Sequence, residues 1–212
     1  MTALAEAIPR PRTRNANLAV DVALVVGGSL FIALMAQVTV HLRFVPITGQ
    51  TLAVVLVGAA MGWKKAGLAV ALYLAEGAAG LPFFASGRAG IDFLILRDPL
   101  HVTGGYLWGF LPAAMLVGFL AERGWDRRFV GGLGAMLLGN LVIFSFGLPW
   151  LAAALGIPVL DAAATPCNLA TAVGCDALEL GLYPFVIGDV LKLLLAAGLL
   201  PAAWRLVGAD RR

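Results

Sequence analysis

Long apolar runs, separated by short polar segments, dominate the chain. A helix that crosses the hydrocarbon core of a membrane needs about 20 mostly apolar residues. Such runs predict an all-α integral membrane protein of six transmembrane helices, over residues 22–40, 51–63, 66–81, 103–121, 129–155 and 182–206. The second and third runs are short, and the basic turn Gly62-Trp63-Lys64-Lys65 between them predicts a helical hairpin.

The positions of the basic residues predict the orientation of these helices. Most of the 15 Lys and Arg residues precede the first run, follow the last, or lie in the second and fourth connections. Since Lys and Arg concentrate on the cytoplasmic side of membrane proteins, both termini are predicted to be cytoplasmic. The expected parts are a cytoplasmic tail over residues 1–17, a six-helix membrane domain over 18–207 and a tail over 208–212. A cleaved signal peptide is less favoured, because the first apolar run exceeds the usual length of roughly 7 to 15 residues.

The composition narrows the class of protein further. Hydrophobic residues make up 61% of the 212 positions and charged residues 13%, with a mean hydropathy of +0.93. A soluble domain is about a quarter charged, so an ordinary soluble fold is excluded. The net charge of +3 could indicate nucleic-acid binding, but the basic residues stand between apolar runs, and no nucleic-acid partner is expected.

The segment over residues 81–103 joins the third and fourth predicted helices. It is too apolar for a solvated loop and too rich in Gly and Pro for a helix. Because irregular backbone at membrane depth needs protein or a cavity beside it, the segment is predicted to cap the bundle. An interfacial loop is the alternative. Within this cap, Arg88 is a candidate for gripping a carboxylate, and a solvated surface arginine is the other interpretation.

Asp189 and Lys192 give the strongest chemical signal. They are three residues apart in the last predicted helix and therefore share a face. Charges in a spanning helix are costly and usually face a substrate path or cavity. A carboxylate that accepts N–H groups and an ammonium that donates to a carbonyl would suit a urea-like or amide-like ligand. A structural ion pair between helices is the alternative.

Other polar and small residues in the predicted helices each have two possible roles. Glu76 could line the ligand cavity or pair with a basic residue of another helix, and Asn140 could bind ligand or bridge two helices. Small residues also form a stripe along the first helix, which suits close packing on a helix of this chain or of a partner protein. The stripe comprises Ala19, Ala23, Gly27, Ser29 and Ala33.

Cys167 and Cys175 lie in the predicted outer loop before the last helix. In an oxidising periplasm they could form a disulfide, and two free thiols are the alternative. The two histidines, His41 and His101, stand apart, so neither a metal site nor a cofactor is predicted. The chain has no Walker motif, so a nucleotide-driven step would need another chain.

Four short blocks resemble, in order, motifs of the BioY family, the biotin-specific substrate-binding (S) components of energy-coupling factor transporters. The blocks are Val45-Pro46-Ile47-Thr48-Gly49-Gln50-Thr51-Leu52, Gly80-Leu81-Pro82-Phe83-Phe84-Ala85-Ser86-Gly87, Thr103-Gly104-Gly105-Tyr106-Leu107 and Gly188-Asp189-Val190-Leu191-Lys192. Together they extend the resemblance over residues 17–206. It implies a six-helix bundle in the bacterial inner membrane, with a biotin pocket open to the outer side.

The resemblance also implies roles for individual residues. Asp189 and Lys192 would contact the ureido ring of biotin and Arg88 its carboxylate, while the motif positions near the pocket are Thr48, Gln50 and Tyr106. Family members associate with a membrane coupling protein (EcfT-type) and ATPase subunits (EcfA-type), and the small-residue stripe of the first helix would be the docking surface. The alternatives are an S component or solo carrier for another small vitamin, and an intramembrane enzyme that uses the Asp and Lys as acid and base.

Overall fold

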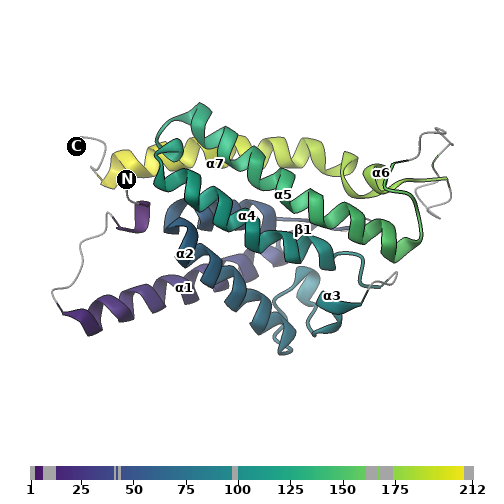
Figure 1. Cartoon of the computed structure of the whole chain (residues 1–212), viewed down its shortest axis with the longest axis horizontal. Helices are drawn as coiled ribbons and strands as arrows, with labels where there is room; N and C mark the ends of the chain where they lie inside the picture. The colour runs from purple at the N-terminus through teal and green to yellow at the C-terminus, as the bar shows by residue number, and fades with distance from the viewer. Residues whose placement is uncertain are drawn as a thin grey trace.

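The computed structural model describes residues 3–6, 13–40, 42, 44–96, 100–160, 167 and 174–207, and the predicted tail over 208–212 lies outside them. Five long helices run along the molecule (Figure 1): α1 (Arg14–Gln37), α2 (Gln50–Ala78), α4 (Gly104–Glu122), α5 (Phe129–Leu155) and α7 (Val186–Val207). The short elements are η1 (Leu4–Glu6), β1 (Thr39–Val40), β2 (Ile47–Thr48), η2 (Ala85–Gly87), α3 (Asp92–Ile95), η3 (Trp125–Arg127), α6 (Ala177–Gly181) and η4 (Tyr183–Phe185).

Within the described residues, four helices are long and apolar enough to cross a membrane by themselves, namely α1, α2, α4 and α5. The short pieces before α7 and α7 itself, bent by 43° against each other, can count as a fifth span. The bounds of α4 and α5 lie close to the predicted runs. α1 differs, because it begins at Arg14 after the N-cap Thr13, whose hydroxyl accepts a hydrogen bond from the backbone N–H of Ala16 at 3.4 Å.

α2 folds back on itself at Gly62. This residue has φ 75° and ψ 168°, a backbone conformation that glycine adopts without a Cβ clash. Nε2 of Gln50 donates a hydrogen bond to the hydroxyl of Tyr73, 23 residues further along the chain. In a straight helix these residues would lie about 35 Å apart. The two halves of α2 therefore lie side by side, and the predicted hairpin is present, with its turn at the first residue of the basic segment.

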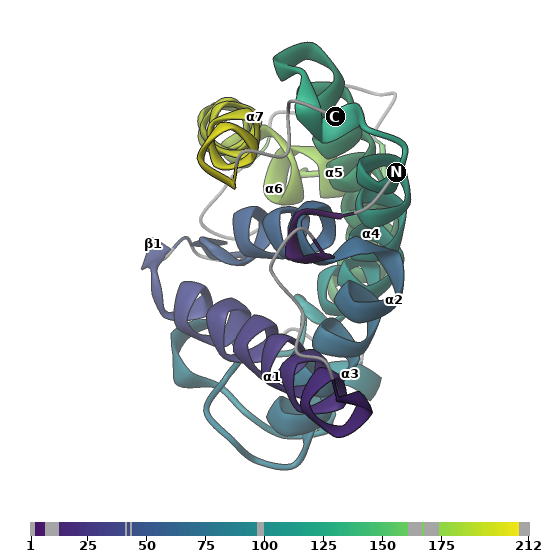
Figure 2. The ribbon, with the colours of Figure 1, turned by 90° about the vertical axis from the view of Figure 1, so that its left-hand side faces the viewer.

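Close backbone contacts hold α4 between α2 and α5. A Cβ atom added at Gly58 would lie 2.8 Å from the carbonyl oxygen of Ala114, and one at Gly118 would lie 2.5 Å from the backbone nitrogen of Trp63. A Cβ atom added at Gly109 would lie 3.0 Å from the carbonyl oxygen of Ile143 on α5. Helices in lipid associate by such close packing of small residues. Seen along the bundle, α1 and α7 lie on opposite sides of α2 (Figure 2).

A two-stranded ribbon, which the helical pattern did not predict, connects α1 to α2. β1 and β2 pair antiparallel, with Thr39 opposite Thr48 and Val40 opposite Ile47. All four residues are β-branched, and such side chains favour extended backbone. The ribbon ends the first helix at Gln37, earlier than predicted, and delivers the chain to the start of α2.

The segment between α2 and α4 folds against the helices, as the cap prediction requires. Nε2 of Gln37, at the end of α1, lies 3.3 Å from the carbonyl oxygen of Pro82 and 3.4 Å from that of Phe84. On the other side, Nε1 of Trp108 donates to the carbonyl of Leu94 at 2.8 Å. The cap is thereby fastened to both α1 and α4.

Candidate functional site

A cavity lies at the end of the bundle where α2, α4 and α7 begin, beneath the cap. Its empty volume is about 650 Å³, which includes space open to solvent. Its aromatic wall comprises Phe84, Phe93, Tyr106, Phe110, Phe144 and Phe185. Its polar lining comprises Thr48, Gln50, Thr51, Arg88, Thr103, Asp189 and Lys192. An apolar pocket with a few converging polar groups can both bury and orient a ligand.

Asp189 and Lys192 form the most strongly charged part of the cavity. Nζ of Lys192 lies 3.1 Å from Oδ1 of Asp189 and 3.2 Å from the hydroxyl of Thr51 on α2. Nδ2 of Asn140 donates to Oδ2 of the same carboxylate at 3.3 Å. Asp189 is buried in the first turn of α7, where the helix dipole favours a negative charge. Since a carboxylate has about four acceptor positions, oxygen lone pairs remain for the N–H groups of a ligand.

Gln50 takes part in a chain of hydrogen bonds that runs from the hairpin to the cap. The hydroxyl of Thr48 donates to Oε1 of Gln50 at 3.0 Å. The amide nitrogen of Gln50 donates to the hydroxyl of Tyr73, which in turn donates to the carbonyl of Phe83 at 3.3 Å. Tyr73 is fully buried. Both ends of the Gln50 amide are thus committed to protein partners, and the chain holds the cap over the cavity.

Arg88 lies at the rim of the cavity. Its backbone pairs with Phe84, whose N–H donates to the carbonyl of Arg88 at 2.9 Å, so the turn between them is closed. The guanidinium lies 5.8 Å from the ring of Phe93 and is exposed. Within the described residues, no carboxylate forms an ion pair with it. The charge of Arg88 is therefore available to an anionic group that reaches the mouth of the cavity.

Tyr106 contributes its ring to the cavity wall. Its hydroxyl donates to the carbonyl of Gly181 at 3.0 Å, which links α4 to the short helix α6. A Cβ atom at Gly147 would lie 2.4 Å from this ring, so the glycine provides the space that the ring occupies. The hydroxyl is used in the fold, and the aromatic face is the part that a ligand would meet.

Two predicted ligand residues do not line the cavity. Asn140 lies behind Asp189 and orients its carboxylate. Glu76 accepts a hydrogen bond from the hydroxyl of Ser29 and so joins α2 to α1. The stripe on α1 is divided as well, since Ser29 and Ala33 are buried in the fold. Its other members, Ala19, Ala23 and Gly27, are exposed.

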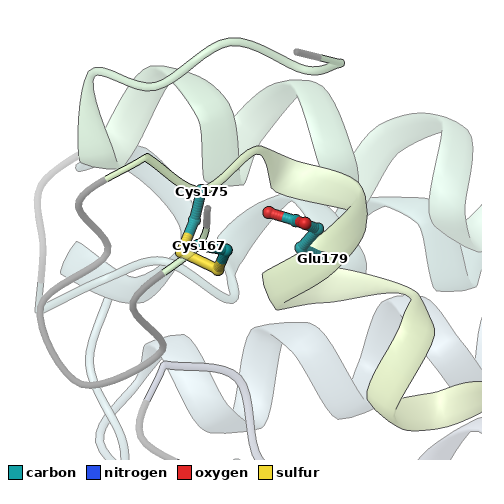
Figure 3. A group of neighbouring side chains, drawn as sticks. All are labelled: Cys167, Cys175 and Glu179. Atoms are coloured by element: carbon teal, nitrogen blue, oxygen red, sulfur yellow. A yellow bond between two sulfur atoms is a disulfide. The ribbon is translucent and has the colours of Figure 1, made fainter. Parts of the chain in front are cut away.

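The structure joins Cys167 and Cys175 in a disulfide, with Cα atoms 4.4 Å apart. Figure 3 shows Glu179 beside this bond. With the sulfurs bonded to each other, they offer no thiolate to a metal ion. Glu179 instead forms a capping box with Asp176, whose Oδ1 accepts from the N–H of Glu179 at 2.8 Å. The disulfide and the capping box together fix the start of α6. This helix carries the carbonyl of Gly181 that Tyr106 contacts.

Sequence reasoning missed Thr51, Tyr73 and most of the aromatic wall. Thr51 directly follows Gln50 in one of the family-like blocks, and its position there was a signal that could have been used. Phe84 lies in another of these blocks, but Phe110 and Phe144 carry no such signal, because an apolar residue in a spanning helix can face lipid, another helix or a cavity. Only the folded chain separates these three environments.

Comparisons with known proteins agree with this geometry. The family model described as "BioY family" matches residues 10–209. A "Biotin transporter BioY" from Rhodobacter capsulatus is 36% identical over 78% of this chain and 83% of its own length. Another from Thermotoga maritima is 34% identical over 76% of this chain and 82% of its own length.

A solved structure shares the fold. It is described as the "S-component for biotin from an ECF-type ABC transporter" and was determined by crystallography. It superposes with a TM-score of 0.71 at 23% identity, and the match covers 92% of this chain and 95% of that chain. The match to the family model over nearly the whole chain, together with these relatives, shows that the chain belongs to the BioY family.

Proposed function

We propose that this chain is the biotin-binding S component of an energy-coupling factor transporter, a transport subunit of the bacterial cell membrane that has no enzymatic site. The proposal is supported by the relatives, which are biotin transporters by name. The observation that carries it is the buried carboxylate of Asp189, placed with Lys192 inside an aromatic-walled cavity. A ureido ring presents two N–H donors and one carbonyl acceptor, and these are the groups that a carboxylate and an ammonium complement.

In this proposal each end of biotin has its own partner. Asp189 accepts the ureido N–H groups, and Lys192 donates to the ureido carbonyl. The aromatic wall covers the apolar part of the ligand, whose removal from water favours binding. Arg88 receives the carboxylate at the rim, where a guanidinium can form two parallel hydrogen bonds. Thr48, Gln50 and Tyr106 position the walls, and Asn140 orients the carboxylate of Asp189.

The proposed topology has six spans and cytoplasmic termini. It counts the two halves of α2 as separate spans, which the reversal at Gly62 supports. It counts the bent pair before and including α7 as one. Lys64 and Lys65 at the hairpin turn and the arginines between α4 and α5 then lie on the cytoplasmic side, in accord with the positive-inside rule. The cavity, at the opposite end, faces outward.

The transporter also needs partners. The chain carries no Walker nucleotide-binding motif. We therefore propose that ATP hydrolysis by ATPase subunits (EcfA-type) drives transport through a membrane coupling protein (EcfT-type). Ala19, Ala23 and Gly27 are exposed on α1, and a Cβ at Gly27 would meet no atom within 4 Å. This exposed half of the stripe is the proposed docking surface for the coupling protein, while Ser29 and Ala33 serve internal packing.

Calorimetric titration of biotin into the purified protein in detergent tests the binding proposal. The parent is expected to bind biotin, and Asp189→Asn to lose on the order of tenfold to a hundredfold in affinity, because a charge-assisted hydrogen bond contributes about 1.5–3 kcal/mol. Glu76→Gln is the matched control, a carboxyl-to-amide change outside the cavity, and is expected to bind as the parent does. A folded parent that does not bind biotin would refute the proposal.

A further inference from the structure

A second, basic groove lies at the end of the molecule opposite the biotin cavity. It is formed where α4 ends, η3 turns and α5 begins, and its charged lining consists of Arg123, Arg127 and Arg128. No acidic side chain is among its lining residues. In Figure 2 this turn stands at the end of the bundle that faces the viewer. The proposed transport function uses none of these residues.

The Arg127 guanidinium is held in place from behind by the end of α7. It lies 4.7 Å from the ring of Trp204, and Nε1 of Trp204 donates to Oδ2 of Asp126 at 2.6 Å. Burial raises the pKa of the Asp126 carboxyl above its usual value, and the nearby positive charge of Arg127 acts in the opposite direction. Nε of Arg127 is itself shielded from solvent and has no hydrogen-bond acceptor among the described residues. The stacking on Trp204 therefore holds the Arg127 guanidinium in place, and no carboxylate among the described residues forms an ion pair with it.

The other two arginines leave donors free as well. Arg123 stacks on the ring of Phe119 and donates one N–H to the carbonyl of that residue at 3.2 Å. A guanidinium has five N–H donors, so most of them remain available. Arg128 is exposed, and within the described part of the chain no carboxylate pairs with it. The groove therefore presents three cations with unused donors to a single anionic group.

Large apolar side chains border these charges. Trp125, Phe129 and Val130 are 41%, 46% and 78% exposed. Tryptophan is enriched at the level of lipid headgroups, and exposed apolar residues below it would meet acyl chains. A free inorganic anion would need the cations alone. A ligand that combines an anionic phosphate with an apolar tail matches both parts of this surface.

We propose that the groove formed by Arg123, Arg127 and Arg128 binds the phosphate headgroup of an anionic phospholipid of the surrounding membrane, with Trp125 and Val130 against its acyl chains. Basic pockets between transmembrane helices are suited to such headgroups. The bound lipid would tie the α4–α5 turn, and through Trp204 the end of α7, to one leaflet. This role is independent of the ligand in the cavity.

Native mass spectrometry of the full chain in detergent, with added phosphatidylglycerol or phosphatidylcholine, tests this proposal. The parent is expected to bind phosphatidylglycerol more tightly than phosphatidylcholine. The double variant Arg127→Gln/Arg128→Gln is expected to lose on the order of tenfold or more, since each basic residue near an anionic lipid surface contributes about 1 kcal/mol. The charge-matched control Lys64→Gln/Arg205→Gln removes two exposed cations outside the groove and is expected to retain the parent's affinity.

Three results would overturn the proposal. They are equal affinity for both lipids, an equal loss in the charge-matched control, and complete displacement of phosphatidylglycerol by excess inorganic phosphate, which would indicate a plain anion site. Biotin titration of the same variants keeps the two sites apart. The groove variants are expected to bind biotin as the parent does, so a failure of lipid binding leaves the biotin proposal untouched.

Discussion

At the scale of single residues, the cavity divides its polar groups between two ends. Asp189 and Lys192 lie on α7 within the membrane-spanning part, whereas Arg88 comes from the cap. Buried charges need partners, and among the described residues Asp189 has Lys192 and Asn140. Arg88 is exposed and has none among the described residues. The protein itself thus supplies partners for the charge at the inner end, whereas at the outer end we expect the ligand's carboxylate to be the partner of Arg88.

This division predicts how Arg88→Ala will behave. The variant is expected to bind biotin on the order of tenfold more weakly, because a hydrogen-bonded ion pair at the rim is lost. It is expected to bind the uncharged biotin amide as the parent does. Titration of both ligands into both proteins gives the coupling between the guanidinium and the carboxylate. Equal weakening for acid and amide would contradict the assignment of Arg88 to the carboxylate.

The sequence identified the charged residues of the cavity because a charge stands out in an apolar run. Asp189, Lys192 and Arg88 were predicted on that basis, and all three line the cavity. Glu76 stood out in the same way, yet it binds Ser29 outside the cavity. A buried charge shows that a partner exists and leaves open whether the partner is a ligand or another helix. That choice depends on packing between distant segments, which one sequence does not contain.

At the scale of elements, the apolar runs predicted the positions of most helices. They did not predict short local departures from helix. α4 and α5 agree closely with predicted runs, and the hairpin was expected from its basic turn. The apolar runs did not predict the ribbon of β1 and β2 or the bend of 43° before α7. Both are short departures from helix inside apolar sequence. Hydropathy averages over about 20 residues and does not detect them.

The close contact between α4 and the turn of α2 makes Gly118 sensitive to any side chain. Gly118→Ala is expected to destabilise the protein by about 1–3 kcal/mol, because the new Cβ would meet backbone atoms of Gly62 and Trp63 that cannot move aside. The measurement is the melting temperature in detergent. Gly27→Ala, where a Cβ meets nothing within 4 Å, is the control and is expected to melt as the parent does. Equal melting of both variants would contradict the contact.

At the scale of the whole molecule, the two ends differ in charge and in redox chemistry. One end carries the basic groove and the hairpin turn with Lys64 and Lys65, and the other carries the cavity, the cap and the disulfide. Disulfides persist in oxidising compartments. Charge and disulfide both agree with the proposed orientation, in which the cavity end lies outside the cytoplasm.

This orientation predicts the labelling of cysteines in intact cells. A membrane-impermeant maleimide is expected to label the partly exposed Cys167 only after treatment with an impermeant reductant. In a background of Cys167→Ser/Cys175→Ser, Arg205→Cys is the matched control and is expected to be labelled only after the cells are permeabilised. Labelling of the native protein without reductant would contradict the disulfide. Labelling only after permeabilisation would contradict the orientation.

The attachment of the cap has a consequence for the rate at which the protein exchanges its ligand. Gln37 and the chain from Gln50 through Tyr73 hold the cap in place, and Phe84, Phe93 and Arg88 of the cap line the cavity. We expect a ligand beneath these residues to leave faster when those hydrogen bonds open. We therefore expect the residence time to depend on local opening of the cap as well as on the contacts to the ligand. Slow release of the ligand would give the ligand-bound chain time to associate with its partner subunits before the ligand dissociates.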